Sequence, residues 1–260
     1  MRSRFPVTGP MLLAHRGWAS RYPENTRVGI EAALRAGVPA VEFDVQLSAD
    51  GVPVVIHDPT LQRTAGLARA VSELSAAELA SVSVHEPARL GEQFTDVPVP
   101  SLADIVVLLK QWPRAYAFVE IKRESAESFG VDETVEIVMQ ALSPVRERCV
   151  VISFVERAVM TARRLGAFAT GWVLNYYDDD ARRLAEAMAP DYLICDHLKL
   201  PAPPAQLWSG PWRWGSYEVT DPAQALALIG RGVCVIESMA AGELARDPRL
   251  NPGCAAGNSA

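Results

Sequence analysis

Two histidines, each at the end of a short apolar run, are the side chains of this sequence best suited to acid–base chemistry. They are His15 and His57, and the chain has only four histidines in all. Between them, a strand-like stretch carries Glu42 and Asp44 at positions where apolar residues would be expected. Together with Arg16, these groups are what metal-assisted acid–base chemistry on a phosphate ester requires.

Side-chain alternation along a strand would bring these acids to one face. Glu42 and Asp44 are two positions apart, so they share a face while the apolar residues 41, 43 and 45 take the other. Glu120 and Lys122 repeat this arrangement in a second strand-like run. In a barrel of parallel strands we expect such side chains to point inward at the C-terminal rim, where barrel enzymes build their sites.

The pair Asp50 and Gly51 predicts how His57 returns to the acids. Asp-Gly between strand-like runs is a strong signal for a two-residue hairpin loop. With that loop, Asp44 would fall directly opposite His57, with their Cβ atoms about 5 Å apart. We therefore expect the hairpin to carry His57 back to the acidic strand.

Three carboxylates without a cysteine ligand make a hard, oxygen-rich site. The set Glu42, Asp44 and Glu120 suits one divalent cation, Mg²⁺, Ca²⁺ or Mn²⁺, rather than structural zinc. Arg16 offers a planar fork for a phosphate group and Lys122 a point charge. Two structural alternatives stay open, since Glu42 could instead pair with Arg16, and Lys122 could only neutralise Glu120.

Short apolar runs alternate with helical patterns from one end of the chain to the other. This alternation predicts parallel strands joined by helical crossovers. Eight such units in 260 residues favour an α/β fold of the closed (β/α)8, or TIM-barrel, type over an open doubly wound sheet. We expect strands at residues 11–14, 40–45, 116–121, 150–154, 170–174, 192–195, 214–219 and 233–236, and helices at 26–36, 102–111, 132–142, 156–165, 179–188 and 222–230.

The stretch from about residue 59 to residue 98 interrupts this rhythm. It follows the second strand and its hairpin, and it is polar and partly helical over residues 71–80. A connection of this length and irregularity is typical of a functional loop, so we expect a lid or a wall of the pocket. Since no linker or repeat divides the rest, we expect residues 1–260 to form a single barrel domain.

Composition is that of an ordinary globular protein, with 49% apolar and 22% charged residues. The net charge of −6 gives no field that would attract nucleic acid or an anionic membrane.

The four cysteines form no CxxC pair, and three lie in apolar runs, so we expect buried free thiols and a reducing compartment. We read the N-terminus as neither a signal peptide nor a membrane anchor, which favours a cytoplasmic location. No pattern indicates an oligomeric state.

Several motifs together resemble the glycerophosphodiester phosphodiesterase family, over roughly residues 11–155. The motifs are His15-Arg16-Gly17, Pro23-Glu24-Asn25-Thr26, Glu42-x-Asp44, Asp50-Gly51, His57-Asp58, Leu61-Gln62-Arg63-Thr64, Val99-Pro100-Ser101-Leu102, Glu120-Ile121-Lys122 and Ser153-Phe154. The resemblance implies a (β/α)8 barrel with a small insertion after the hairpin, which matches residues 59–98.

The resemblance also implies an activity, namely hydrolysis of small glycerophosphodiesters to glycerol 3-phosphate and an alcohol, within lipid and glycerol metabolism. In the family mechanism a neighbouring glycerol hydroxyl attacks phosphorus, and water then opens the cyclic phosphate. We favour His15 as the acid and His57 as the base, and the sequence leaves the reverse assignment open. By position, the residues implied are the metal ligands Glu42, Asp44 and Glu120, the phosphate contacts Arg16 and Lys122, and the acid–base pair His15 and His57.

The C-terminal third departs from the family pattern. Where a Trp-Thr-x-Asn pattern is usual, this chain has Trp214-Gly215-Ser216-Tyr217, and in place of a Thr-Asp pair it has Ile236-Glu237-Ser238. These differences concern the pocket rather than the chemistry. Trp214 is either core packing or a wall for the glycerol, and Asn25 either caps the first helix or lies near the site.

Two other functions would use only part of this set. A barrel hydrolase that acts on sugars through paired carboxylates would need neither Arg16 nor two histidines. A barrel that only binds glycerophosphodiesters would not need the two histidines as an acid–base pair. A metal-dependent phosphodiesterase uses all of these groups, and it is the function that the sequence predicts.

Overall fold

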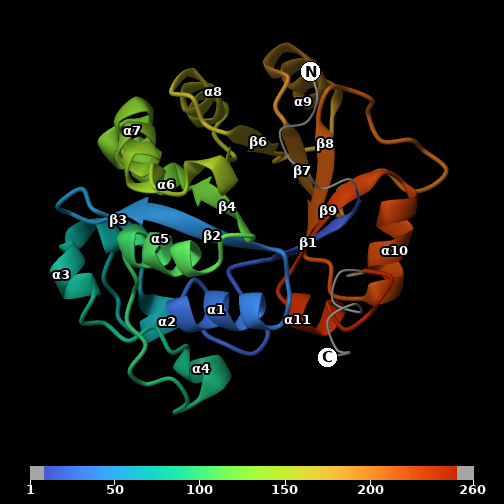
Figure 1. Ribbon diagram of the computed structural model, residues 1–260. Coiled ribbons are helices and arrows are strands. Elements are labelled where there is room, and N and C mark those ends of the chain that lie inside the picture. The colour runs from blue at the N-terminus through green and yellow to red at the C-terminus, as the bar shows by residue number, and fades with distance from the viewer. Residues whose placement is uncertain (1–8, 251–260) are drawn as a thin grey trace.

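Eight parallel strands close into a barrel in the computed structural model, which describes residues 9–250 (Figure 1). Closure is complete because β1 pairs in parallel with both β2 and β9. The additional strand β3 is antiparallel to β2 and lies outside the ring. The structure therefore confirms the predicted (β/α)8 fold. The strands are β1 (Met11–Ala14), β2 (Ala40–Leu47), β3 (Pro53–Val55), β4 (Tyr116–Ile121), β5 (Cys149–Ser153), β6 (Ala169–Val173), β7 (Tyr192–Asp196), β8 (Arg213–Tyr217) and β9 (Val233–Ser238).

The helices lie around the outside of the barrel (Figure 1). The Thr26 hydroxyl accepts a hydrogen bond from Gly29 N–H at the start of α1, and Asp221 caps α10 just before a proline. The helical segments are α1 (Arg27–Arg35), α2 (Gln62–Ala65), η1 (Val71–Glu73), α3 (Ala76–Leu79), α4 (Pro87–Leu90), α5 (Leu102–Gln111), α6 (Arg123–Phe129), α7 (Val131–Leu142), η2 (Arg146–Arg148), α8 (Glu156–Arg164), α9 (Asp179–Met188), α10 (Pro222–Gly230) and α11 (Ala241–Leu244).

Strand alternation divides the apolar core into two layers. The outward faces of the strands pack under the helices, and the residues of β2 in this layer are Val41, Phe43 and Val45. The inward faces fill the barrel interior with a second cluster that includes Phe118 and Tyr192, whose rings meet edge to face at 5.1 Å. The barrel is therefore a packed core rather than a pore, and its upper end is left for polar side chains.

Residues 59–98 form a small layer of short helices with an apolar core of its own. This third cluster includes Leu61, Val71 and Leu79, all fully buried. The predicted helical stretch at 71–80 is present as η1 and α3. The expectation of a pocket wall is corrected, because no residue between 59 and 98 lines the pocket described below. The segment instead fastens to the chain between β1 and α1, where Arg89 donates to the Ala19 carbonyl.

The hairpin between β2 and β3 has a register one residue away from the predicted one. The structure pairs Val45 with Val55, so Asp44 does not lie opposite His57. The loop contains three residues rather than two, because Ser48 N–H donates to the Val52 carbonyl and Gly51 adopts a φ of 74°. A three-residue loop that ends in a left-handed glycine is the usual alternative to the two-residue hairpin turn. His57 thus follows the end of the ladder instead of belonging to it.

Three of the cysteines lie within residues 9–250, and all three are free thiols, as predicted. Cys149 and Cys195 are buried, whereas Cys234 is partly exposed. Cys254 lies outside the described residues. In the same part of the chain, every helix is too short or too polar to span a lipid bilayer.

Candidate active site

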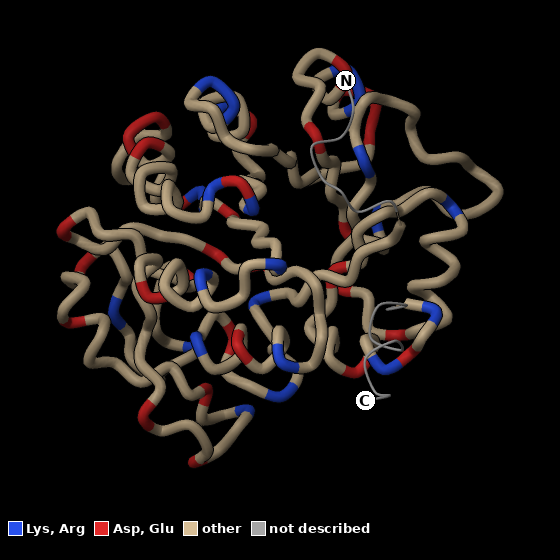
Figure 2. Tube along the Cα trace, viewed as in Figure 1, with Lys and Arg blue, Asp and Glu red and all other residues tan. Residues whose placement is uncertain are grey.

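A pocket of about 160 Å³ opens at the C-terminal end of the barrel strands. Figure 2 shows acidic and basic positions facing one another around the centre of this ring of strands. Its polar lining contains five of the residues predicted from the sequence, and its floor is apolar. The lining residues are His15, Arg16, His57, Glu120, Lys122, Ile152, Phe154, Val173, Ile194, Tyr217, Glu218 and Glu237.

On β2, β4 and β9, the inward side chains change from apolar to acidic two residues further along the strand. On β4 the inward side chain before Glu120 is Phe118, and on β9 the one before Glu237 is Val235. On β2 the inward residue Ala40 is followed by the two acids on the same face. Because the strands are parallel, their polar ends meet at one rim, as the alternation in the sequence predicts.

The turn after β1 aims Arg16 into this rim. Arg16 and Gly17 both have left-handed backbone conformations, with φ of 54° and 79°. A Cβ at Gly17 would lie 2.7 Å from the Gly29 carbonyl carbon, so only glycine fits there. The Arg16 N–H donates to Glu42 Oε2 (2.9 Å), and its guanidinium Nε lies 3.4 Å from Asp44 Oδ2.

The three predicted metal ligands converge, with one oxygen from each of Glu42, Asp44 and Glu120 within 4.8 Å of the others. Asp44 and Glu120 are register partners on β2 and β4. Lys122 Nζ lies 3.3 Å from Asp44 Oδ1 and 2.8 Å from Glu120 Oε1. Lys122 therefore pairs with Glu120, as one of the two alternatives predicts, and it also lines the pocket.

Asn25 lies at the site and does not cap α1, since Thr26 does so. Its side-chain amide donates to Asp44 Oδ2 (2.8 Å), and its carbonyl oxygen accepts the Asp44 N–H (3.0 Å). This two-point contact requires a left-handed backbone at Asn25, with φ of 55°. Asn25 thus holds Asp44 in place but does not itself line the pocket.

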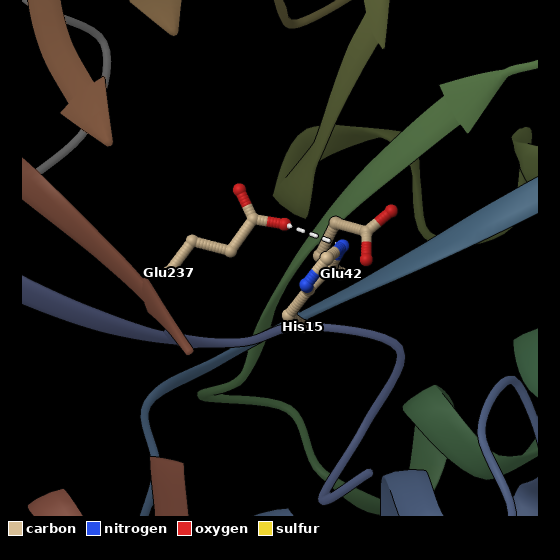
Figure 3. A group of neighbouring side chains, drawn as sticks. All are labelled: His15, Glu42 and Glu237. Atoms are coloured by element: carbon tan, nitrogen blue, oxygen red, sulfur yellow. Dashed lines mark ion pairs between the residues drawn. The ribbon is translucent and has the colours of Figure 1, made fainter. Parts of the chain in front are cut away.

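Glu237 and Glu218 are site residues that the sequence analysis did not assign. Figure 3 shows the Glu237 carboxylate pointing from β9 toward the His15 ring, with Glu42 nearby, and Glu237 Oε1 lies 3.6 Å from His15 Nε2. Glu218 Oε1 lies 3.4 Å from His15 Nδ1. His15, Glu42 and Glu237 form a second group whose ligand atoms lie within 4.8 Å of one another. The signal for Glu237 was the same as for Glu42, an acid inside an apolar strand.

The pKa values of the acids shift in different directions, because Lys122 and Arg16 both lie within ion-pair distance of Asp44. Burial alone would raise the pKa of Asp44, but the charges of Lys122 and Arg16 outweigh it and hold that pKa below its usual range. Burial raises the pKa of Glu42 well above its usual value, and the neighbouring Asp44 charge raises it further. Glu237 is likewise raised, by burial and then by the charge of Glu120. The pKa values of Glu42 and Glu237 rise because burial removes each carboxylate from water and no cationic side chain in the described part of the chain lies close enough to offset this.

The two histidines occupy different environments. Burial, followed by the charge of Arg16, lowers the pKa of His15 to about 3, so His15 is neutral in the free protein. His57 is about one-third exposed in its side chain, and its Nδ1 lies 2.7 Å from Asp58 Oδ1. An ionised Asp58 can only accept, so Nδ1 carries the proton and Nε2 is left as the basic atom.

The donor set fits a hard divalent cation. Three carboxylates supply the oxygen ligands that Mg²⁺, Ca²⁺ and Mn²⁺ prefer. Glu42 Oε1 is buried without a hydrogen-bond partner, which is costly for a carboxylate unless a cation satisfies it. Glu42, Asp44 and Glu120 are therefore the residues that would hold such an ion.

Trp214 does not line the pocket, so of its two alternatives the structure supports core packing and not a wall for the glycerol. On β8 its side chain faces outward into the layer under the helices, where Trp214 Nε1 donates to the Trp208 carbonyl (3.0 Å). Alternation turns Tyr217, three positions later, to the opposite face and into the pocket. The aromatic walls of the pocket are Tyr217 and Phe154.

Comparison with known proteins identifies the family of this chain. The model of the glycerophosphoryl diester phosphodiesterase family matches residues 15–167, which is more than half of the chain. The chain belongs to this family. A glycerophosphodiester phosphodiesterase from Bacillus altitudinis is 33% identical over 147 residues, covering 55% of this chain and 57% of the relative. The match thus spans little more than half of that protein.

Solved structures of the glycerophosphodiester phosphodiesterase family share the fold over nearly the whole chain. A phosphodiesterase from Oleispira antarctica, solved with the product sn-glycerol-3-phosphate, has a TM-score of 0.80 at 22% identity and covers 92% of this chain and 96% of its own. The glycerophosphodiester phosphodiesterase of Agrobacterium tumefaciens has a TM-score of 0.73 at 21% identity, covering 91% and 99%. At these identities the likeness establishes the barrel alone.

Proposed function

We propose that this protein is a metal-dependent glycerophosphodiester phosphodiesterase that releases glycerol 3-phosphate and an alcohol. The observation that carries the proposal is the convergence of three carboxylates, two imidazoles and two cationic side chains on one pocket. Family membership supports the same reaction class. We extend the proposal to the whole chain as a single barrel domain, and to a cytoplasmic location, which the free thiols at Cys149, Cys195 and Cys234 favour.

Glu42, Asp44 and Glu120 would hold one divalent cation, Mg²⁺, Ca²⁺ or Mn²⁺. When bound, such an ion neutralises phosphate oxygens and lowers the pKa of a coordinated hydroxyl. Asn25 serves this site indirectly, because its two hydrogen bonds fix the orientation of the Asp44 carboxylate. The second candidate set, with His15, shares Glu42 with the first.

Arg16 and Lys122 would bind the phosphate of the diester. Both line the pocket, and both are strongly held as cations, since neighbouring carboxylates outweigh burial and raise the pKa of each side chain. Arg16 presents a planar fork suited to two phosphate oxygens, and Lys122 presents a compact charge. Their positions favour a substrate with one negative charge between them.

His57 would act as the base and His15 as the acid. In the first step His57 Nε2 takes the proton of a glycerol hydroxyl, whose oxygen attacks phosphorus, while the leaving alcohol receives a proton from His15. The anionic diester offsets the Arg16 charge that helps to lower the pKa of His15, so substrate binding favours protonation of His15. In the second step water opens the cyclic phosphate with the roles of the two imidazoles reversed, which gives glycerol 3-phosphate.

The test is a hydrolysis panel of several glycerophosphodiesters with Mg²⁺, Ca²⁺ and Mn²⁺. We expect turnover that chelator abolishes and added metal restores. His15→Ala and His57→Ala should each lower kcat by roughly 100-fold or more, because each removes a proton-transfer group. The matched control is His85→Ala, in the insertion, which should keep normal turnover. Near-normal rates in both site variants, or full activity in chelator, would refute the proposal.

A further inference from the structure

Arg63, at the start of the insertion, binds two carboxylates from different segments of the chain, those of Glu24 and Asp58. Its Nη1 and Nη2 donate to Glu24 Oε2 (2.8 Å) and Oε1 (2.6 Å). Its Nε and Nη2 donate to Asp58 Oδ2 (2.7 Å) and Oδ1 (3.0 Å). Two bidentate contacts from one guanidinium are geometrically specific, and a lysine cannot reproduce them.

Each of these carboxylates continues to a residue of the proposed catalytic set. Asp58 Oδ1 lies 2.7 Å from His57 Nδ1. Glu24 Oε1 accepts a hydrogen bond from Arg16 Nη1 at 3.1 Å. A continuous polar chain therefore runs from Arg16 through Glu24, Arg63 and Asp58 to His57.

The insertion also fixes the Glu24 end of this chain. Glu24 is buried, and its N–H donates to Glu86 Oε1 at 2.7 Å. Arg89 holds the same Glu86 carboxylate through Nε and Nη2, both at 2.7 Å, and donates to the Tyr22 carbonyl at 2.8 Å. The short helices that do not line the pocket thus clamp the loop that carries Glu24.

We propose that Arg63 is a positioning residue for the phosphodiesterase reaction. Through Asp58 it holds His57 with Nδ1 protonated and Nε2 free to accept a proton, and through Glu24 it orients the Arg16 guanidinium toward the phosphate. The inference rests on the proposed function, because it takes His57 as the base and Arg16 as the phosphate contact. It gives residues 59–98 a role in catalysis that does not require them to cover the pocket.

Substitutions at the two ends of this series of polar contacts, at Asp58 and at Glu24, should have different kinetic effects. Asp58→Asn should lower kcat, since the asparagine amide can present an N–H donor to the imidazole of His57 and no longer fixes Nδ1 as the protonated nitrogen. Glu24→Gln should raise KM, since Arg16 loses one of its two buried anionic partners and keeps only Asp44. Arg63→Ala should do both, with kcat lower by roughly 10- to 100-fold, the usual loss when a group that orients an active-site residue is removed. Arg63→Lys should not restore the rate.

The control variant is Arg69→Ala, in the same insertion. The Arg69 side chain is exposed and pairs with Glu73 at 3.4 Å, away from Glu24 and Asp58, so its loss should leave kcat and KM unchanged. Arg63 is half-exposed, so guanidinium ion added to the solvent can reach the vacated position. We expect millimolar guanidinium, well below denaturing concentration, to restore part of kcat in Arg63→Ala and none in Asp58→Asn.

Nitrogen-15 NMR of the imidazole of His57 gives a readout that does not depend on turnover. Wild type should show a protonated Nδ1, and Arg63→Ala and Asp58→Asn a mixture of tautomers. Equal kinetics in Arg63→Ala and Arg69→Ala, or an unchanged imidazole signal in Arg63→Ala, would overturn the inference. If wild type hydrolyses no diester, the proposed function fails, and the tautomer measurement alone decides whether Arg63 positions His57.

Discussion

At the scale of single residues, the site holds more negative charge than its own cations balance. Asp44 lies within ion-pair distance of both Lys122 and Arg16. Among the described residues, no lysine or arginine side chain lies within that distance of Glu42 or Glu237, and burial raises the pKa of both. A divalent cation would remove this imbalance, so the metal-free protein should be the less stable form.

Glu237→Gln tests this imbalance through the pH dependence of stability. Because the folded-state pKa of Glu237 is raised, its contribution to stability is fully present below about pH 4.5 and is lost as pH rises toward the folded-state pKa. Glutamine does not titrate, so metal-free Glu237→Gln should gain Tm over wild type, and the gain should grow from pH 5 to pH 8. Each kcal/mol corresponds to about 2–4 °C in a chain of this size. Differential scanning fluorimetry in chelator measures the shift.

The exposed Glu127 on α6 provides the matched control for that measurement. Glu127→Gln removes the same charge from a solvated position, so its Tm difference from wild type should stay flat over the same pH range. A flat difference in Glu237→Gln as well would show that the buried acid carries no such penalty.

At the scale of elements, the turn between β1 and α1 sets the geometry of the phosphate-binding side. Arg16, Gly17 and Asn25 all adopt left-handed backbone conformations within this one connection. The turn is held from outside by the insertion and from inside by Glu42, which accepts the Arg16 N–H. The helix behind it approaches so closely that Gly17 faces the backbone of Gly29 directly.

Gly17→Ala should therefore damage both stability and binding. A left-handed alanine costs about 1 kcal/mol, and the overlap of its Cβ with α1 adds to that. We expect a loss of at least about 2 kcal/mol in urea unfolding, with a raised KM because Arg16 moves with the turn. Gly166→Ala is the control, since Gly166 has a φ of 81° but nothing within 4 Å of its Cβ position. Equal losses in the two variants would show that the close approach to α1 does not matter.

At the scale of the whole molecule, barrel closure brings the site together. The proposed ligands come from β2 and β4, His15 directly follows β1, and Glu237 lies on β9 near the other end of the sequence. A cation bound to Glu42, Asp44 and Glu120 would join neighbouring strands of the closed ring. Binding should therefore stabilise the global fold rather than one loop.

Added Mg²⁺ or Ca²⁺ should raise the Tm of the metal-free protein. At a free concentration 100 times the Kd, mass action gives about 2.7 kcal/mol, or roughly 5–10 °C. Asp44→Asn should abolish most of this shift, whereas Asp96→Asn, an exposed acid in the insertion, should keep it. A shift of equal size in Asp44→Asn would place the cation elsewhere.

Much of the site follows from local patterns that folding preserves. Alternation along β2 and β4 predicts that Glu42, Asp44 and Glu120 share the inward face, and the structure shows them there. Alternation is a property of any strand, so the inference does not depend on the neighbouring elements. The same rule, applied to β8 and β9, would have turned Trp214 outward and Glu237 inward.

The sequence by itself determined the barrel, because a strict alternation of strands and helices has few ways to bury its apolar faces. It also determined which strands carry acids at their C-terminal ends. Only the tertiary structure decided the hairpin register, since one residue more in a loop shifts every pair. It alone revealed the contacts of Arg63 with Glu24 and Asp58, which join segments far apart in the chain. Such contacts depend on how separate elements pack against one another. Packing between distant segments produces no periodic pattern of residue types, so a single sequence does not predict it.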